Sequence, residues 1–250
     1  MSDVHLPAQV IDTGQRSWTN KHITFTQPLQ GLYDVWNPGA GSPLERYNAT
    51  TTALLDVVRE AAQKGVRARA LGGGWSFSRA PATEGWLLNT KPLNLQFQVG
   101  GELVHPGYVG DRPGLRFLQC GNSIQEINRV LRRESRSLRT TGASNGQTIA
   151  GAAGTGTHGS RIDGGSIADY VVGMHLITGP GKHIWLERAS APVLSDTFAS
   201  RLGATPVRND ALFNAASVSF GSFGIVHGVV IETDPIYLLE EHRHRMPLQA

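Results

Sequence analysis

The sequence predicts an α+β fold in two lobes that divide near residue 110. Three observations carry this prediction. A helical period runs on from Ala53, a hairpin pattern covers Val171–Leu186, and a β-branched run covers Ile225–Thr233. Such a mixture of helix and strand patterns in one chain is typical of the α+β class.

The first lobe is expected over about residues 40–110. Its helix buries one apolar face that includes Leu54, Val57 and Ala61, and it ends at Gly65. Thr51 or Thr52 can cap its start. Short strands are expected at Ile23–Phe25, Leu32–Val35, Val66–Leu71 and Trp86–Asn89.

The second lobe is expected over about residues 111–235, and its elements follow in order. Ser123 and Glu126 form a capping box, which places the start of a helix directly after it. Gly179-Pro180-Gly181 closes the predicted hairpin. The remaining expected elements are strands at Leu115–Cys120 and Ile225–Thr233 and a short helix at Asp210–Ala216.

Length and composition are those of a globular protein. The chain has 250 residues, of which 40% are hydrophobic, and no run is long enough to cross a membrane. The N-terminus lacks a secretory pattern, and Cys120 is the only cysteine, so we expect a cytoplasmic protein. The Asn48 glycosylation pattern is then irrelevant. With a net charge of only +3 we expect no nucleic-acid and no membrane partner. The basic cluster at 129–139 fits a solvated helix face or an anionic ligand, and we favour the first.

The 30 glycines gather in a few segments. The first, Arg69–Ser78, is a strand that leads into Gly72-Gly73-Gly74 and then into Ser76 and Ser78. Adjacent backbone N–H groups in such a loop form a concave nest that binds anions, and the serines add hydroxyl donors. A flexible surface turn is the alternative.

The second segment, Gly142–Ser160, consists almost entirely of small or polar residues. Thr148 to Ala153 begins a short helix whose first N–H groups can face a phosphate. A formal G-x-G-x-x-G lies at Gly154, Gly156 and Gly159. It does not follow a strand and has no acidic residue at the required distance, so it is not a Rossmann fingerprint.

Together these segments resemble the vanillyl-alcohol-oxidase, or PCMH-type, family of FAD-binding flavoproteins, nearest to its sugar, alditol and aldonolactone oxidases. In that family a loop of the form R-G-G-G-H-S is followed by a small-residue stretch that ends in T-H-G. Leu71-Gly72-Gly73-Gly74-Trp75-Ser76 and Thr157-His158-Gly159 match these two elements. The stretch 220–226 resembles a third, near the adenine end of FAD.

The resemblance implies one FAD-binding domain over residues 1–250, with FAD between the lobes and no metal. It leaves the catalytic residues unknown. The cofactor-binding residues that it implies are Leu71, Gly72, Gly73, Gly74, Trp75, Ser76, Gly142, Ala143, Gly146, Gln147, Thr148, Gly151, Thr155, Thr157, His158, Gly224 and Ile225.

Three departures from the family pattern matter. Trp75 stands where many members carry a histidine that is covalently linked to the flavin, and no cysteine lies within Gly142–Gly146 for a second link. We therefore expect FAD to be held non-covalently. Members usually continue into a cap domain that covers the flavin, and we expect no such domain in this chain. A partner polypeptide or a second copy would then cover the flavin.

Two histidine positions in the sequence could have a functional role. His158 resembles a family histidine that lies near the flavin. We expect it to support the loop or the cofactor by hydrogen bonding. The alternatives are that it acts as the catalytic base or that it only forms hydrogen bonds with nearby backbone groups. His242-Arg243-His244 lies in a polar tail without further ligands, so a metal site there is not expected.

The resemblance implies an FAD-dependent oxidoreductase in which a hydroxyl-bearing carbon of a small sugar, alditol or lactone gives hydride to the flavin. Two alternatives stay open. One is a non-catalytic FAD subunit or a fragment that needs a partner chain. The other is an NADPH-using reductase with the same FAD fold, which the second glycine segment fits less well.

Overall fold

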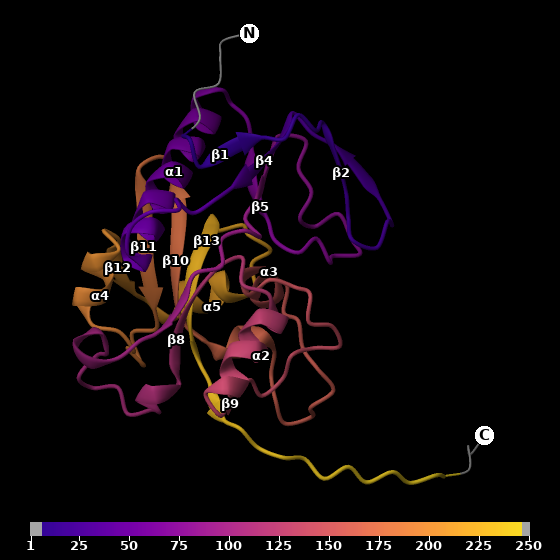
Figure 1. Cartoon of the computed structure of the whole chain (residues 1–250), viewed down its shortest axis with the longest axis vertical. Coiled ribbons are helices and arrows are strands. Elements are labelled where there is room, and N and C mark those ends of the chain that lie inside the picture. The colour runs from indigo at the N-terminus through magenta and orange to yellow at the C-terminus, as the bar shows by residue number, and fades with distance from the viewer. Residues whose placement is uncertain (1–6, 247–250) are drawn as a thin grey trace.

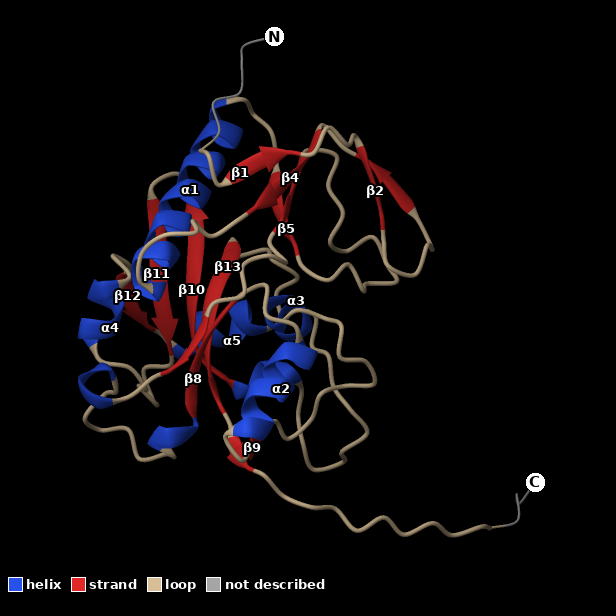
Figure 2. Ribbon diagram, in the orientation of Figure 1, coloured by secondary structure: helices blue, strands red, loops and turns tan. Residues whose placement is uncertain are grey.

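The computed structural model describes residues 7–246, so the two ends of the predicted 1–250 domain lie outside the described residues. The chain forms two principal sheets, one of four strands and one of six, and they mark two lobes (Figure 1). Long loops form much of both lobes on the side of the molecule toward which the C-terminal segment extends (Figure 2). Mixed helices and strands in two lobes confirm the predicted α+β class.

The first lobe is built on the four-stranded sheet, in the order β1-β4-β6-β5. Its strands β4, β6 and β5 are parallel, and β1 pairs with β4 in the antiparallel sense. A separate β2–β3 hairpin lies beside this sheet. The bounds are β1 Val10–Asp12, β2 Ser17–Thr19, β3 Thr26–Pro28, β4 Gly31–Val35, β5 Ala68–Leu71 and β6 Trp86–Asn89.

Helix α1 (Pro43–Gln63) joins the two lobes. Leu54, Val57 and Ala61 pack with strands of the four-stranded sheet and also with Ile177 and Ile225 of the six-stranded sheet. The helix begins well before Ala53, so its predicted start was wrong.

The cap of α1 explains the error. Ser42 accepts a hydrogen bond from the backbone of Glu45, the Glu45 carboxylate accepts one from the backbone of Ser42, and Pro43 occupies the first turn. This is a complete capping box with a proline at its favoured position. The apolar period covers only the part of the helix that is buried against both sheets, so it missed the first turns.

The second lobe is built on the six-stranded sheet, in the order β12-β11-β10-β13-β8-β7. All its neighbouring strands are antiparallel except β11 and β12. The hairpin of β10 and β11, the strand β8 and the strand β13 lie where the sequence predicts them. The bounds are β7 Gln96–Gln98, β8 Leu115–Gln119, β10 Val171–Gly179, β11 Lys182–Glu187, β12 Thr205–Arg208 and β13 Ile225–Glu232, with a small β9 (Arg136–Ser137) and β14 (Asp234–Pro235) pair beside them.

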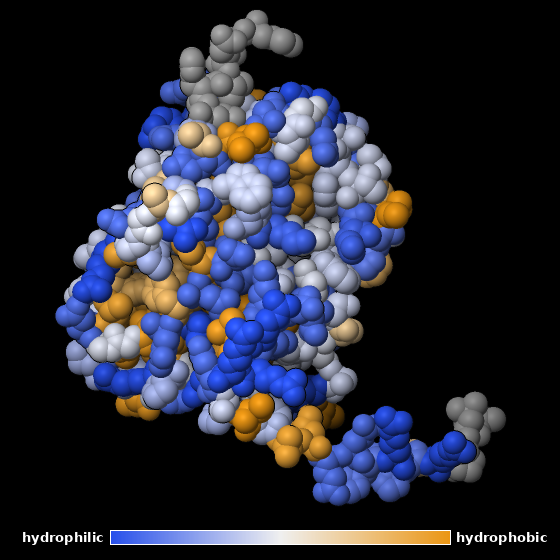
Figure 3. All heavy atoms as spheres, in the orientation of Figure 1, coloured by the Kyte–Doolittle hydropathy of each residue, from blue (hydrophilic) through white to orange (hydrophobic). Residues whose placement is uncertain are grey.

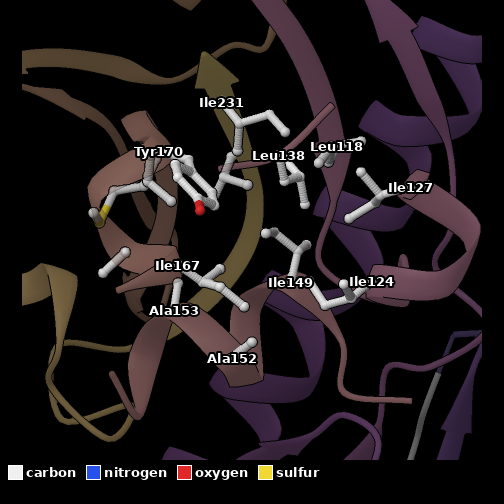
Figure 4. Close-up of a cluster of buried hydrophobic side chains, with 14 of the residues drawn as sticks. Leu118, Ile124, Ile127, Leu138, Ile149, Ala152, Ala153, Ile167, Tyr170 and Ile231 are labelled. Carbon is white, nitrogen blue, oxygen red and sulfur yellow. The ribbon is translucent and has the colours of Figure 1, made fainter. Parts of the chain in front are cut away.

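Helices cover both faces of this sheet. On one face α2 (Ile124–Arg133), α3 (Ile149–Gly154) and α5 (Asp210–Ser217) enclose a core with β8 and β13, part of which Figure 4 shows. The predicted Ser123–Glu126 capping box of α2 is present. On the other face α4 (Asp196–Arg201) packs around Phe117, Trp185 and Phe198. Short 3-10 turns lie at Gly101–Leu103, Arg112–Gly114 and Ile167–Tyr170.

The two sheets divide the chain earlier than the sequence predicts. β1 and β4 precede residue 40 but belong to the first lobe, and β7 precedes residue 110 but pairs with β8 of the second. The division therefore falls between β6 and β7. A short strand whose apolar and polar residues do not alternate clearly gives too little information to predict which sheet it joins.

No helix among residues 7–246 has the length and apolar character that a membrane crossing needs. Apolar side chains are visible where the C-terminal segment leaves the body (Figure 3). Among them are the exposed residues Ile236, Leu238 and Leu239.

Candidate functional site

A deep cleft of about 660 Å³ lies between the two lobes. It is lined by α1, by β5 and the loop after it, by α3 and its flanking loops, and by β10, α5 and β13. A volume of this size lies within the range of roughly 300–1,000 Å³ that is usual for small-molecule and cofactor sites. All of the predicted cofactor-binding residues except Gly142, Ala143, Gly146 and His158 line this cleft.

The first glycine loop leaves β5 at Leu71 and passes close to the second glycine loop. A Cβ added to Gly73 would lie 2.7 Å from the carbonyl oxygen of Gly146, which is closer than real Cβ atoms approach. A Cβ added to Gly72 would collide with the side chain of Thr148. These two positions therefore have no room for side chains, because Thr148 and Gly146 of the second loop occupy the space.

The second glycine loop contributes polar atoms that have no partner. Thr148 precedes α3, is only 1% exposed, and makes no capping hydrogen bond with its side chain. Its Oγ1 and the Oε1 of Gln147 are buried without a hydrogen-bond partner. Such groups cost free energy, typically about 1–3 kcal/mol each, unless a ligand or water satisfies them.

The predicted short helix is present as α3, but only part of its start faces the cleft. The backbone N–H of Ile149 donates to the carbonyl of Asn122 at 2.8 Å, away from a ligand. Ala150, Gly151, Ala153 and Gly154 line the cleft.

The third segment, 220–226, leads into β13 and lines the cleft on that side. Gly224 has a φ of +125°, a conformation open to glycine, and an added Cβ would meet the carbonyl of Ile177. The backbone N–H of Phe220 donates to the carbonyl of Gly154 at 2.9 Å. Arg69 of β5 donates to the carbonyl of Phe220, so this hydrogen bond ties the first lobe to the third segment across the cleft.

Four predicted residues lie outside the lining. Gly146 sits behind the first loop, against the indole of Trp75, and a Cβ on Gly142 would touch Thr157. Ala143 is exposed. His158 is exposed as well, and its Nδ1 lies 3.0 Å from the carbonyl oxygen of Gly159 in its own loop. His158 thus lies outside the lining of the cleft, in a loop that pairs with Ser166, and its cofactor contact stays a prediction.

Sequence reasoning missed a group of small and apolar lining residues. They come from α1, β5 and the loop after it, α3, β10 and α5, which the chain brings together from distant positions. In the sequence they are recognisable only as small or apolar residues on the buried or cleft-facing side of each element. Those that define the walls are Val58, Ala61, Ala62, Ala68, Ala70, Ala80, Ala150, Ala153, Met174, Ile177 and Ala216.

Charge in the cleft is sparse and positive. Arg69 is the only charged residue among its described lining residues, and no aspartate, glutamate or histidine is among them. Burial lowers the pKa of Arg69 from its ordinary value, with the neighbouring Arg67 acting in the same direction. An anionic group in the cleft meets a positive charge and no carboxylate.

A cleft between a mainly parallel and a mainly antiparallel sheet, bordered by glycine loops and by an unpartnered hydroxyl and amide oxygen, defines a domain that binds a ligand between its two lobes. A family model described as "FAD binding domain" matches residues 47–187. The chain belongs to this family of FAD-binding domains, and its cofactor is FAD.

Curated relatives share the region. The chain is 27% identical over 196 residues to L-gulono-1,4-lactone dehydrogenase of Mycobacterium tuberculosis, covering 78% of this chain and 38% of the relative. It is 29% identical over 195 residues to D-arabinono-1,4-lactone oxidase of Debaryomyces hansenii, covering 76% of this chain and 32% of the relative. The chain thus spans about a third of the length of these relatives.

Solved structures share the fold. Cholesterol oxidase from Brevibacterium sterolicum superposes with a TM-score of 0.64 at 13% identity, over 92% of this chain and 40% of that one. Xylooligosaccharide oxidase from Myceliophthora thermophila superposes with a TM-score of 0.60 at 18% identity, over 87% of this chain and 38% of that one. At these identities the likeness concerns the fold, and it agrees with the predicted PCMH-type architecture.

Proposed function

We propose that this chain is the FAD-binding part of an oxidoreductase that oxidises a hydroxyl-bearing carbon of a small sugar lactone. The observation that carries the FAD site is the cleft between the lobes, where glycine loops meet at van der Waals distance beside unpartnered polar atoms. The reaction class rests on the relatives, which are named as lactone dehydrogenases and oxidases.

The residues present fit FAD on structural grounds. Thr148 Oγ1 and Gln147 Oε1 are buried polar atoms that lack partners and border the cleft. Gly72 and Gly73 line the cleft without side chains, and they let the second glycine loop pack directly against the first. The Thr148 hydroxyl and the backbone N–H groups of these loops suit the close approach of a pyrophosphate, whereas Gln147 Oε1 suits an N–H or O–H group of the cofactor, because an amide oxygen only accepts hydrogen bonds. When bound, FAD supplies the two-electron acceptor, and the protein binds and orients it.

We further propose that the loops Leu71–Ser76 and Gln147–Gly151 hold the phosphates, and that Arg69 adds a positive charge to that end of the cleft. Gly224 and Ile225 would line the nucleotide end. The apolar walls from α1 and α5 exclude water from the buried part of the cofactor. The division into two lobes with FAD between them is part of this proposal, as is a cytoplasmic location, which the single, buried Cys120 supports.

Non-covalent attachment is the first prediction from this proposal. The residue after Gly74 is Trp75, whose indole offers no nucleophile for a link to the flavin, and no cysteine borders the cleft. Acid precipitation of the purified yellow protein should leave a colourless pellet and free FAD in the supernatant, measured by absorbance and mass spectrometry. Flavin retained on the denatured chain would contradict the proposal. A protein purified without flavin should bind added FAD by titration, and failure to bind would refute the proposed site.

A second prediction concerns Thr148. The Thr148→Val variant replaces an unpartnered buried hydroxyl with a methyl of similar size. The FAD-free protein should be as stable as the parent or slightly more stable, because an unsatisfied polar group has been removed. FAD affinity should fall by roughly tenfold or more, the effect of one hydrogen bond to a charged group.

The opposite signs of the two effects make this test specific. Urea unfolding measures the first effect and FAD titration the second. Thr52→Val serves as the matched control, because Thr52 is exposed on α1 and its hydroxyl bonds only to the Asn48 carbonyl at 3.2 Å. Unchanged FAD affinity in Thr148→Val would exclude this hydroxyl from the cofactor site.

A second candidate function is an FAD-binding subunit whose reaction needs groups from another polypeptide or a second copy. The observation that favours it is that the described lining holds no carboxylate or histidine able to remove a proton. Steady-state oxygen consumption by the FAD-loaded monomer, across aldonolactones and alditols, separates the two functions. Rapid reduction of the flavin by NADPH would instead indicate the reductase alternative.

A further inference from the structure

We propose that Trp75 clamps the two glycine-rich loops together and thereby sets the width of the cleft where they meet. This inference rests on the proposed FAD site and deepens it. It assigns to Trp75 a positioning role that acts through both loops, in addition to its place in the cleft lining.

The indole lies directly against the α-carbons of both loops. A Cβ added to Gly146 would lie 2.6 Å from Cε2 and 2.8 Å from Nε1 of Trp75. A Cβ added to Gly73 would lie 2.8 Å from Cδ1 of the same ring and 2.7 Å from the Gly146 carbonyl oxygen. Gly73, Gly146 and the ring thus form one contact in which neither glycine can carry a side chain without displacing a neighbour. The indole is the side chain that joins the two loops at this point.

The back of the first loop is held by the segment between β2 and β3. The buried side chain of Asn20 donates to the carbonyl of Ser76 at 2.9 Å, and the backbone N–H of Lys21 donates to the carbonyl of Gly74 at 2.8 Å. The His22 ring meets the indole edge-on, with ring centres 5.3 Å apart. Because this segment fixes the loop on one side of Trp75, movement of the ring is transmitted to Gly146 on the other.

Trp75 is not part of the hydrophobic core. It belongs to none of the buried apolar clusters of the described chain and is itself only half-buried. No described residue accepts a hydrogen bond from its Nε1. A large aromatic ring placed at a cleft wall, between two glycines, controls the shape of that wall more than the stability of the fold.

The test uses four variants of the full chain: Trp75→Ala, Trp75→Phe, Gly146→Ala and the Trp75→Ala/Gly146→Ala double variant. Trp36→Ala is the matched control, because Trp36 is a 47% exposed tryptophan outside the cleft lining. FAD affinity is measured by titration of the FAD-free protein. Amide hydrogen exchange of residues 142–148 in that same FAD-free state gives a readout that does not involve the cofactor.

We expect Trp75→Ala to weaken FAD binding by roughly tenfold and to speed exchange in 142–148, with a thermal midpoint near that of the parent. Trp75→Phe should restore part of both. Gly146→Ala should weaken FAD binding in the parent, where its methyl meets the indole, but add little in the Trp75→Ala background, where the ring is gone. This lack of additivity is the signature of direct coupling.

The outcomes separate this inference from the proposed function. If the parent protein binds no FAD, the proposed function fails, and slower exchange of 142–148 in the parent than in Trp75→Ala would still support the clamp. If the parent binds FAD and Trp75→Ala binds it equally well with unchanged exchange, the clamp is refuted and the FAD site stands. Additive effects of Trp75→Ala and Gly146→Ala would also overturn it.

Discussion

Replacing Gly73 with valine is expected to weaken FAD binding strongly while the fold persists. The backbone of Gly73 is not in a left-handed conformation, so valine causes no torsional strain there. Its Cβ would, however, lie 2.7 Å from the Gly146 carbonyl oxygen and 2.8 Å from the Trp75 ring. The two loops must then separate, and the proposed phosphate cradle opens.

Overpacking of this kind costs about 1–3 kcal/mol, so FAD affinity should fall by up to roughly 100-fold. Titration of the FAD-free protein measures the affinity, and circular dichroism checks the fold. Gly100→Val is the matched control, because Gly100 has open space where its Cβ would be and no positive φ. A Gly73→Val protein that keeps full FAD affinity would show that this loop does not hold the phosphates.

Acid is expected to destabilise the FAD-free protein through a buried histidine cluster between α1 and the six-stranded sheet. The Tyr47 hydroxyl and His175 Nδ1 are hydrogen-bonded at 2.7 Å, and His175 Nε2 is bonded to His183 Nδ1 at 2.8 Å. His227 stacks on Tyr47 with ring centres 4.2 Å apart, and its Nδ1 is buried without a partner. Both His175 and His227 are fully buried.

Burial determines the direction of the effect. It lowers the pKa of His227 to about 3 and, with the neighbouring histidines, lowers that of His175 well below its ordinary value of 6.5. The unfolded chain therefore binds protons that the folded chain does not, from pH 6.5 down to the folded pKa. Stability is fully present above about pH 6.5 and is lost as the pH falls.

For His227 alone the free energy of unfolding should drop by about 2 kcal/mol between pH 7 and pH 5, since each pKa unit is worth about 1.4 kcal/mol. Urea unfolding at the two pH values measures it. Buried Glu187, whose pKa burial raises, acts in the opposite direction, so the His227→Gln variant is needed to isolate the contribution. That variant should lose about 2 kcal/mol of the pH dependence. His242→Gln, changed in the exposed tail, is the control. An unaltered pH dependence in His227→Gln would contradict the assignment.

The sequence by itself determined the elements that short-range chemistry specifies. The Ser123–Glu126 capping box fixed the start of α2, the Gly179-Pro180-Gly181 turn fixed the hairpin, and the β-branched run fixed β13. The glycine segments identified most of the cleft lining. Where the backbone must approach another group closely, side chains do not fit, and glycines therefore cluster in the sequence. FAD followed from their order and spacing through family resemblance.

Only the tertiary structure decided which distant residues meet. Ala61 of α1, Ala150 of α3 and Ala216 of α5 share one cleft because two sheets and a bridging helix bring them together, and a single alanine carries no local signal of this. The same holds for Arg69 against Phe220 and for Trp75 against Gly146. The exposed position of His158 is likewise decided by the fold, through the pairing of its loop with Ser166, and its cofactor role stays a prediction. Periodicity and caps depend on neighbours within a few positions, whereas a cleft wall depends on how whole elements pack against each other.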